Sequence, residues 1–249
     1  MRELSTPPSL RSPGSTLSAS VLDPLLRINP AGPRITYYDD ATGERIELST
    51  ATLHNWAAKS ANLLRDELGA GPGSRVAILL PAHWQTAGVL LGVWYIGAEV
   101  VLGQGDCDIA CCTADRLDEA DAAVVPGGEV VALSLDPFGK PIADLPFGIT
   151  DYATSVRVHG DQISPAPQPG PALAEQSPAE VLAAAETAGA AMGLTSTDRV
   201  LSTAGWDTAE AMVDHLLAVF AAGASLVQVT NPDQDAQERR RTTEKVTRG

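Results

Sequence analysis

The chain has 249 residues, of which 44% are hydrophobic and 19% charged, the ordinary balance of a folded globular protein. Its net charge of −14 opposes binding to nucleic acid and to anionic membranes, so neither is an expected partner. The longest apolar stretch, residues 87–98, is too short to span a bilayer, and residues 1–20 lack the apolar core of a signal peptide. We therefore expect a cytoplasmic protein.

The cysteines do not form a recognisable disulfide or metal-binding pattern. There are three, Cys107, Cys111 and Cys112, an odd number with two adjacent, and their spacing is not that of a zinc site. Residues 109–112 are small and apolar, which predicts a buried strand and inert thiols. No metal site is predicted, and a reducing compartment fits this cysteine usage.

The N-terminal part predicts a short helix followed by a hairpin. Residues 1–16, rich in Ser and Pro, are expected to be disordered. A helix is predicted from Leu17 to Arg27. Two alternating runs, 34–39 and 45–48, flank an Asp/Gly turn, which is the pattern of a β-hairpin.

A repeating strand–helix pattern follows the hairpin. Ser49 is a natural N-cap for an amphipathic helix that reaches about Leu68. The continuous apolar run 75–80 is typical of a buried parallel strand. A helix over 83–96 and a strand over 99–102 complete the unit. This alternation predicts an α/β fold, a mostly parallel sheet or sheets with helices on both faces.

The remainder predicts a second α/β segment after a proline-rich linker. Weaker strands are expected at 109–113, 122–125 and 130–135, and mostly loop from 136 to 160. After the linker, a helix begins at Pro178 and two further strands flank a helix with a strong apolar stripe. The predicted organisation is a disordered N-terminus (1–16), an α/β subdomain with the hairpin (17–160), the linker (161–177), a second α/β segment packed on the first (178–231) and a frayed polar tail (232–249).

Two stretches resemble a known superfamily. Within residues 34–102, the pieces Gly69–Ala77, Leu80–Pro81 and Trp94–Val101 resemble the opening of the adenylate-forming enzymes, which include acyl-CoA synthetases, luciferases and peptide-synthetase adenylation domains. Residues 184–229 resemble a later strand–helix–strand of the same superfamily. The resemblance implies the first half of the family's N-terminal domain. The whole chain is similar to a short actinobacterial group related to acyl-CoA synthetases.

The resemblance also implies a nucleotide-binding feature that this sequence lacks. The family carries a Ser/Thr/Gly-rich phosphate loop with a lysine just before the second stretch, where backbone N–H groups cradle ATP phosphates. Here residues 163–180 read "ISPAPQPGPALAEQSPAE", with prolines at 165, 167, 169, 171 and 178. Proline has no N–H to donate. We therefore expect no ATP or Mg²⁺ as cofactor.

The expected function is a non-catalytic remnant of an adenylate-forming enzyme that acts as a binding or interaction module. The family's adenine contacts, magnesium-binding acid and C-terminal catalytic lysine are expected to lie beyond this chain, and no catalytic residue is assigned. The alternative is an atypical acyl-CoA synthetase-like ligase that activates a carboxylic acid with ATP and Mg²⁺. A homodimer or a protein partner is expected to cover apolar faces that half a fold would expose.

One residue is a candidate for substrate binding. The segment "WDTA", residues 206–209, aligns with a family motif Phe-Asp-x-Ser whose aspartate meets a substrate amine, so the resemblance implies that Asp207 is an amine-binding carboxylate. The other interpretation is that Asp207 caps a helix beginning at Thr208.

Overall fold

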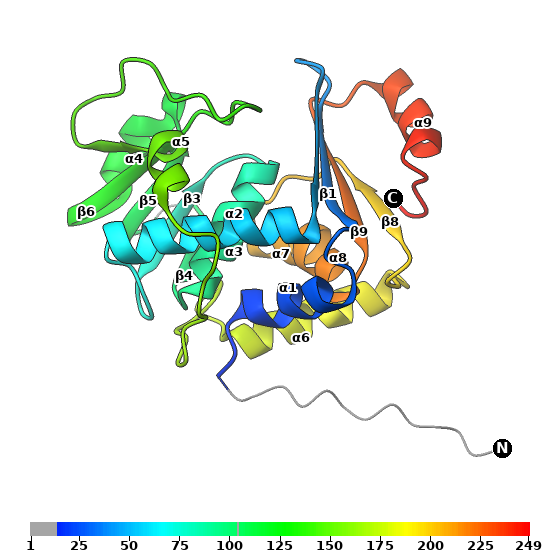
Figure 1. The fold of residues 1–249 in the computed structure, drawn as a ribbon, viewed down its shortest axis with the longest axis horizontal. Coiled ribbons are helices and arrows are strands. Elements are labelled where there is room, and N and C mark those ends of the chain that lie inside the picture. The colour runs from blue at the N-terminus through cyan, green and yellow to red at the C-terminus, as the bar shows by residue number, and fades with distance from the viewer. Residues whose placement is uncertain (1–13, 104) are drawn as a thin grey trace.

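The computed structural model describes residues 14–103 and 105–249 and contains two sheets (Figure 1). One has four strands in the order β2 (Glu44–Ser49), β1 (Pro33–Asp39), β9 (Ser225–Thr230), β8 (Arg199–Ser202). The other has five, β4 (Glu99–Val101), β3 (Arg75–Leu79), β5 (Cys107–Thr113), β6 (Val124–Leu133), β7 (Ile149–Asp151). All pairs except the β1–β2 hairpin are parallel, as the sequence predicts.

A layer of helices joins the two sheets. It comprises α1 (Leu17–Ile28), α2 (Thr50–Asn62), α3 (Trp84–Tyr95), α6 (Pro178–Ala191) and α8 (Ala218–Ala221). One buried cluster runs through this layer and takes residues from both sheets, among them Ile35 of β1 and Val76 of β3. α4 (Leu117–Ala123) covers the opposite face of the five-stranded sheet. No helix among the described residues is long and apolar enough to cross a bilayer.

The helix starts follow their predicted caps. Ser49 accepts a hydrogen bond from the Thr52 N–H at the start of α2. Ser177 and Glu180 form a reciprocal capping box at the start of α6, with Pro178 in the first turn. α2 continues through a π-helical turn, η1 (Leu63–Glu67), close to the predicted end at Leu68.

The cysteines lie in or at the end of a buried strand, as predicted. Cys107, Cys111 and Cys112 are free and buried on β5. Because side chains alternate along a strand, Cys111 faces the helix layer and Cys112 faces α4. Cys107 also packs on the α4 side, because the strand pairing shifts register between Cys107 and Ile109. Burial raises the pKa of all three thiols, that of Cys112 to about 11.

The region between β5 and the proline-rich segment is more regular than predicted. The two strands expected at 122–125 and 130–135 are one strand, β6, because Gly127 adopts a left-handed conformation (φ +86°) inside it rather than ending it. The stretch 136–160, expected as mostly loop, contains β7, the helical turn α5 (Tyr152–Ser155) and a 3₁₀ turn.

The proline-rich segment, residues 161–177, is not the flexible linker that the sequence predicts. It is ordered against the rest of the chain, and we call it the strap. It runs along the end of α3 and the edge of β4, where Leu173 bridges Val100 and the Trp94 indole N–H donates to the Ala172 carbonyl (2.8 Å). Ala172 and Leu173 are buried. A β-carbon at Gly97 would lie 2.9 Å from Pro169 Cα, so the absence of a side chain there allows the strap to approach closely.

The C-terminal tail, predicted to be frayed, is also ordered. It forms α9 (Gln234–Thr243), which packs beside the β1–β2 hairpin at the outer side of the four-stranded sheet (Figure 1). Arg240 and Glu244 are buried there, and the Arg248 carbonyl accepts the Leu201 N–H (2.9 Å). Ion pairs to residues far away in sequence hold this segment, which composition alone does not reveal.

Pairing between distant segments also places the hairpin with the C-terminal strands. β1 pairs in parallel with β9, residue Ile35 opposite Leu226. The four-stranded sheet is therefore built from both ends of the described chain, and the five-stranded sheet from its middle.

Candidate functional site

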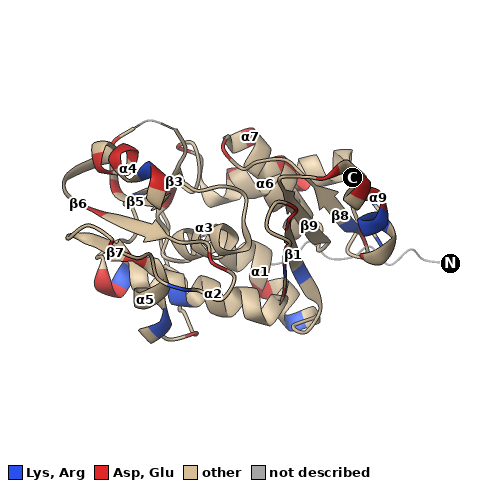
Figure 2. Cartoon of the chain, turned by 90° about the horizontal axis from the view of Figure 1, so that it is seen from above, with Lys and Arg blue, Asp and Glu red and all other residues tan. Residues whose placement is uncertain are grey.

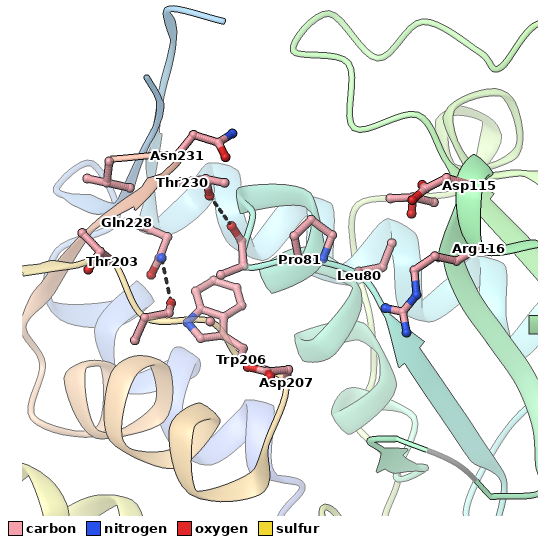
Figure 3. Close-up of a pocket in the computed structure, with 15 residues that line it drawn as sticks. Leu80, Pro81, Asp115, Arg116, Thr203, Trp206, Asp207, Gln228, Thr230 and Asn231 are labelled. Carbon is pink, nitrogen blue, oxygen red and sulfur yellow. Dashed lines mark hydrogen bonds between the residues drawn. The ribbon is translucent and has the colours of Figure 1, made fainter. Parts of the chain in front are cut away.

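A cleft lies where parallel strands of both sheets end (Figure 3). Its volume is about 550 Å³, within the range of small-molecule sites. The residues that line it follow or end β3, β5, β8 and β9. In open α/β sheets, ligands bind at the carboxyl ends of strands, because the connecting loops there diverge and leave room. The fold thus places this cleft where a binding site is expected.

The wall formed by β8 and β9 contains polar groups without partners. Gln228 donates its amide to the Ala204 carbonyl (3.0 Å), which holds the loop after β8. Its Oε1 and the Trp206 indole N–H belong to residues that line the cleft, but both atoms are buried and have no hydrogen-bond partner in the described part of the chain. A buried donor and a buried acceptor left unpaired each cost free energy that a polar ligand or water would recover.

The opposite wall comes from the turn after β5 (Figure 3). Asp115 is exposed there, and hydrogen bonds from the Thr113 hydroxyl and its own backbone N–H lower its pKa. Arg116 forms a bidentate pair with Glu119 (2.8 and 2.7 Å), which raises the pKa of the guanidinium. The cleft therefore has one fixed cation and one fixed anion on this side.

Asp207 lies at the mouth of the cleft and is exposed (Figure 3). The interpretation that it caps the following helix is wrong, because the cap is Thr208, whose hydroxyl accepts the Ala211 N–H at the start of α7 (Ala209–Met212). A β-carbon at Gly205 would lie 2.7 Å from Asp207 Oδ1, so the carboxylate lies against the loop after β8. Because Thr208 is the helix cap, the Asp207 carboxylate is not used to cap α7.

The two sheets are tied together at the floor of the cleft. The Thr230 hydroxyl donates to the Ala82 carbonyl (3.2 Å), which joins the end of β9 to the loop after β3. Pro81 in that loop fills the middle of the floor (Figure 3). This contact fixes the distance between the walls.

Several backbone N–H groups of the proline-rich strap are already used in hydrogen bonds. The N–H groups of Ala166 and Gly170 donate to the carbonyls of Tyr95 and Gly97 (both 2.9 Å). Those of Ala172 and Gln176 are used within the strap, and that of Glu175 donates to the Glu99 carboxylate (2.7 Å). A phosphate nest needs several N–H groups pointing at one anion, and the five N–H groups named here already donate to protein acceptors.

The histidines do not converge on the cleft. His83 caps α3 through Nδ1, His159 pairs with Glu67, and His54 packs edge-on against Tyr95. His215 lines a different hollow beside β8. Across residues 14–103 and 105–249, no three His, Cys, Asp or Glu side chains are placed to hold a metal ion.

Sequence reasoning found Asp207 but missed Arg116, Gln228 and the unpaired indole of Trp206. A signal was available for Arg116, since it is the third residue after a predicted strand (109–113), and parallel strands bring their carboxyl ends together. The sequence contains no such signal for Gln228, because the position of a glutamine within an apolar strand does not indicate which face of the sheet its side chain occupies.

Comparisons with known proteins agree with this architecture. Residues 29–104 match the family described as AMP-binding enzyme. The fold is similar to a Brucella canis acyl-CoA synthetase (TM-score 0.77, 18% identity) and to the anthranilate CoA ligase AuaEII crystallised with anthranoyl-AMP (0.74, 15%). Each alignment covers 94% of this chain but only 46% and 49% of those proteins, so the chain spans about half their length. The chain thus has the fold of the N-terminal half of those proteins.

A nearer relative has the same extent. A TIGR03089 family protein of Mycobacterium tuberculosis is 65% identical over 237 residues, which cover 94% of this chain and 98% of that protein. The chain belongs to the TIGR03089 family.

Proposed function

We propose that this protein is a non-catalytic member of the adenylate-forming fold that binds a small molecule in the cleft between its two sheets. The observation that carries the proposal is the strap. Where the resemblance implies an ATP phosphate loop, proline and paired N–H groups leave no cradle for a triphosphate. Transfer of a nucleotide needs its developing charge to be neutralised, and the strap supplies no cation for that role.

ATP binding and adenylate formation test this proposal. Calorimetry with MgATP should show no saturable heat, and pyrophosphate exchange with a panel of carboxylic and amino acids should stay at background. A full-length acyl-CoA synthetase run in parallel is the positive control. Exchange above background with any acid would establish the alternative, an atypical ligase, and overturn the proposal.

The ligand class that the cleft favours is a small amino acid-like zwitterion. Asp207 supplies an exposed carboxylate for an amine, while the unpaired Trp206 N–H offers a donor to a carboxylate. Gln228 Oε1 offers an acceptor deeper in the wall. Charged hydrogen bonds of this kind are stronger than neutral ones, so they would orient such a ligand.

Saturation-transfer NMR with the free amino acids as probes tests the ligand class. We expect at least one to bind, and Asp207→Asn to weaken it about 10-fold, since a hydrogen bond to a charged group contributes about 1.5 kcal/mol. Thr208→Ala is the matched control: it removes the helix cap and should lower stability without changing affinity. Binding unaffected by Asp207→Asn would remove Asp207 from the site.

The expected homodimer or protein partner is retained as part of the proposal. Phe147 and Val158, which lie on either side of β7 in the sequence, are strongly exposed. Exposed apolar side chains of this kind support a protein contact at this part of the chain. Light scattering on the purified chain should give a mass above the 25.9 kDa of one copy, or a partner should co-purify. A monodisperse single copy with no partner would contradict this part.

A further inference from the structure

A second hollow lies on the outer side of α2, away from the cleft. It has a volume of about 450 Å³. Its walls are Trp56 and Lys59 of α2, Trp84 at the start of α3, Phe138 in the loop after β6, and Arg157. None of these residues lines the cleft between the sheets, so the two sites are separate.

Aromatic side chains form its apolar surface. The Trp56 and Trp84 rings meet edge to face, with centroids 5.4 Å apart and planes 67° apart. The Trp84 N–H is held by Glu44 (3.2 Å), which fixes the ring. Phe138 is 80% exposed, so its ring lacks the apolar packing that aromatic side chains normally gain. An aromatic ligand would supply that packing.

The loop that carries Phe138 is held in place by hydrogen bonds. The Asp136 carboxylate accepts the Phe138 N–H (2.8 Å), and the Gln85 amide donates to the Asp136 carbonyl (3.0 Å). Arg157 donates to the Phe138 carbonyl (3.2 Å) and to the Gly139 carbonyl. The exposed ring is therefore presented by a fixed backbone.

The charges around the hollow are positive, in contrast to the rest of the molecule. Lys59 and Arg157 are its charged residues, and no carboxylate lines it among the described residues. Figure 2 shows basic segments beside α2 and α5, with acidic segments close to α5 and a further basic run on α9. In a chain of net charge −14, two cations without a lining acid mark a local preference for an anion.

Both cations have donors left for a ligand. Lys59 Nζ donates to the His159 carbonyl (2.6 Å), and Arg157 uses Nη2 on the loop carbonyls. An ammonium has three N–H donors and a guanidinium five, so each retains unused ones. These backbone carbonyls hold the Lys59 ammonium and the Arg157 guanidinium in place, and because carbonyls are neutral, both side chains keep their positive charge.

We propose that this hollow binds a planar aromatic carboxylate, with the ring against Trp56, Trp84 and Phe138 and the carboxylate at Lys59 and Arg157. Apolar aromatic walls with a few convergent polar groups are the usual make-up of a small-molecule site. The ring supplies buried area, and the two cations select the anion over a neutral molecule of the same shape. This site does not depend on the cleft or on the proposed function.

Calorimetry with 2-naphthoate on the intact chain tests the proposal, with 2-naphthamide as the neutral isostere. We expect one saturable site for naphthoate and at least about 10-fold weaker binding of the amide, because the neutral amide accepts hydrogen bonds from the two cations but carries no negative charge to pair with them. Lys59→Met and Arg157→Met should each weaken naphthoate about 5-fold, the effect of losing one partly exposed ion pair. Arg116→Met, which removes a cation from the cleft instead, should leave binding unchanged.

Amide NMR mapping on the unsubstituted chain provides a readout that does not rely on the variants folding. Naphthoate should shift amides of α2 and of residues 136–139, and leave residues 203–207 unaffected. Absence of saturable binding, equal affinity for the amide, or shifts centred on 203–207 would each overturn the proposal.

Discussion

Glu244 joins the C-terminal segment to the hairpin. Its carboxylate accepts from Tyr38, from Arg199 and from Arg45 (2.9 Å for Arg45 Nη2), and only 6% of its side chain is exposed. Burial by itself would raise its pKa, but the hydrogen bonds outweigh burial and lower the pKa to about 2. The folded state therefore prefers the charged carboxylate.

The depressed pKa has a definite consequence for stability. Since the folded value is below the ordinary 4.5, Glu244 contributes stability that is complete above about pH 4.5 and is lost as the pH falls toward 2. Glu244→Gln should lower the free energy of unfolding by roughly 2–3 kcal/mol at pH 7, because the largely buried Arg199 loses its buried partner and keeps only the more exposed Glu47. The difference from the unsubstituted chain should shrink below pH 4.5. Urea unfolding at several pH values measures both effects.

Glu47→Gln is the matched control for that substitution. Glu47 also contacts Arg45 and Arg199 but is 38% exposed, so solvent screens its ion pairs. Its loss should cost well under 1 kcal/mol. Equal losses for the two variants would show that the buried position of Glu244 is not what matters.

At the scale of elements, α2 and α3 pack closely against each other. A β-carbon at Gly92 of α3 would lie 2.7 Å from Ser60 Cβ and 2.9 Å from the Ala61 nitrogen of α2. The helices pack so closely there that only glycine fits. This contact holds the helix layer that supports both sheets.

Gly92→Ala should therefore destabilise the protein. The added methyl must push against backbone, which costs about 1–3 kcal/mol, more than the gain in helix propensity. Gly88→Ala, on the same helix, places its β-carbon 3.4 Å from Trp56 Cβ, an ordinary contact, and should be neutral or slightly stabilising. Thermal unfolding of both variants makes the comparison, and a neutral Gly92→Ala would refute the close-packing argument.

The elements differ in how far the sequence predicts them. The helices and strands from residue 17 to 113 follow from apolar periodicity and from caps such as Ser49, because these signals are local. The strap does not, because its order depends on Trp94, Gly97 and Glu99, which are distant in sequence. The prolines correctly indicate an extended backbone, but they do not indicate that this backbone packs against α3 and β4.

At the scale of the whole molecule, one core cluster links the two sheets. It includes Ile35 of the four-stranded sheet, Val76 of the five-stranded sheet and Leu90 of the helix layer between them. A shared core makes independent unfolding of either sheet costly, because each would leave the layer half exposed. The strap and tail add further contacts between distant segments.

The chain should consequently unfold in one cooperative transition. Native-state hydrogen exchange measures this directly: slow amides of β5 and of β9, one from each sheet, should report the same opening free energy. The exposed first turn of α9 should exchange faster and serve as the internal reference for local opening. Two separate free energies for β5 and β9 would show that the sheets are independent units.

The sequence by itself determined the local elements and the parallel α/β class, because periodicity and caps act over a few residues. Only the tertiary structure decided that both chain ends share one sheet, that Thr208 rather than Asp207 caps its helix, and that the strap and tail are docked. It also placed Arg116 opposite Asp207 and the two tryptophans beside Lys59. These arrangements depend on which distant side chains meet, and that is set by packing of the whole chain rather than by any one segment.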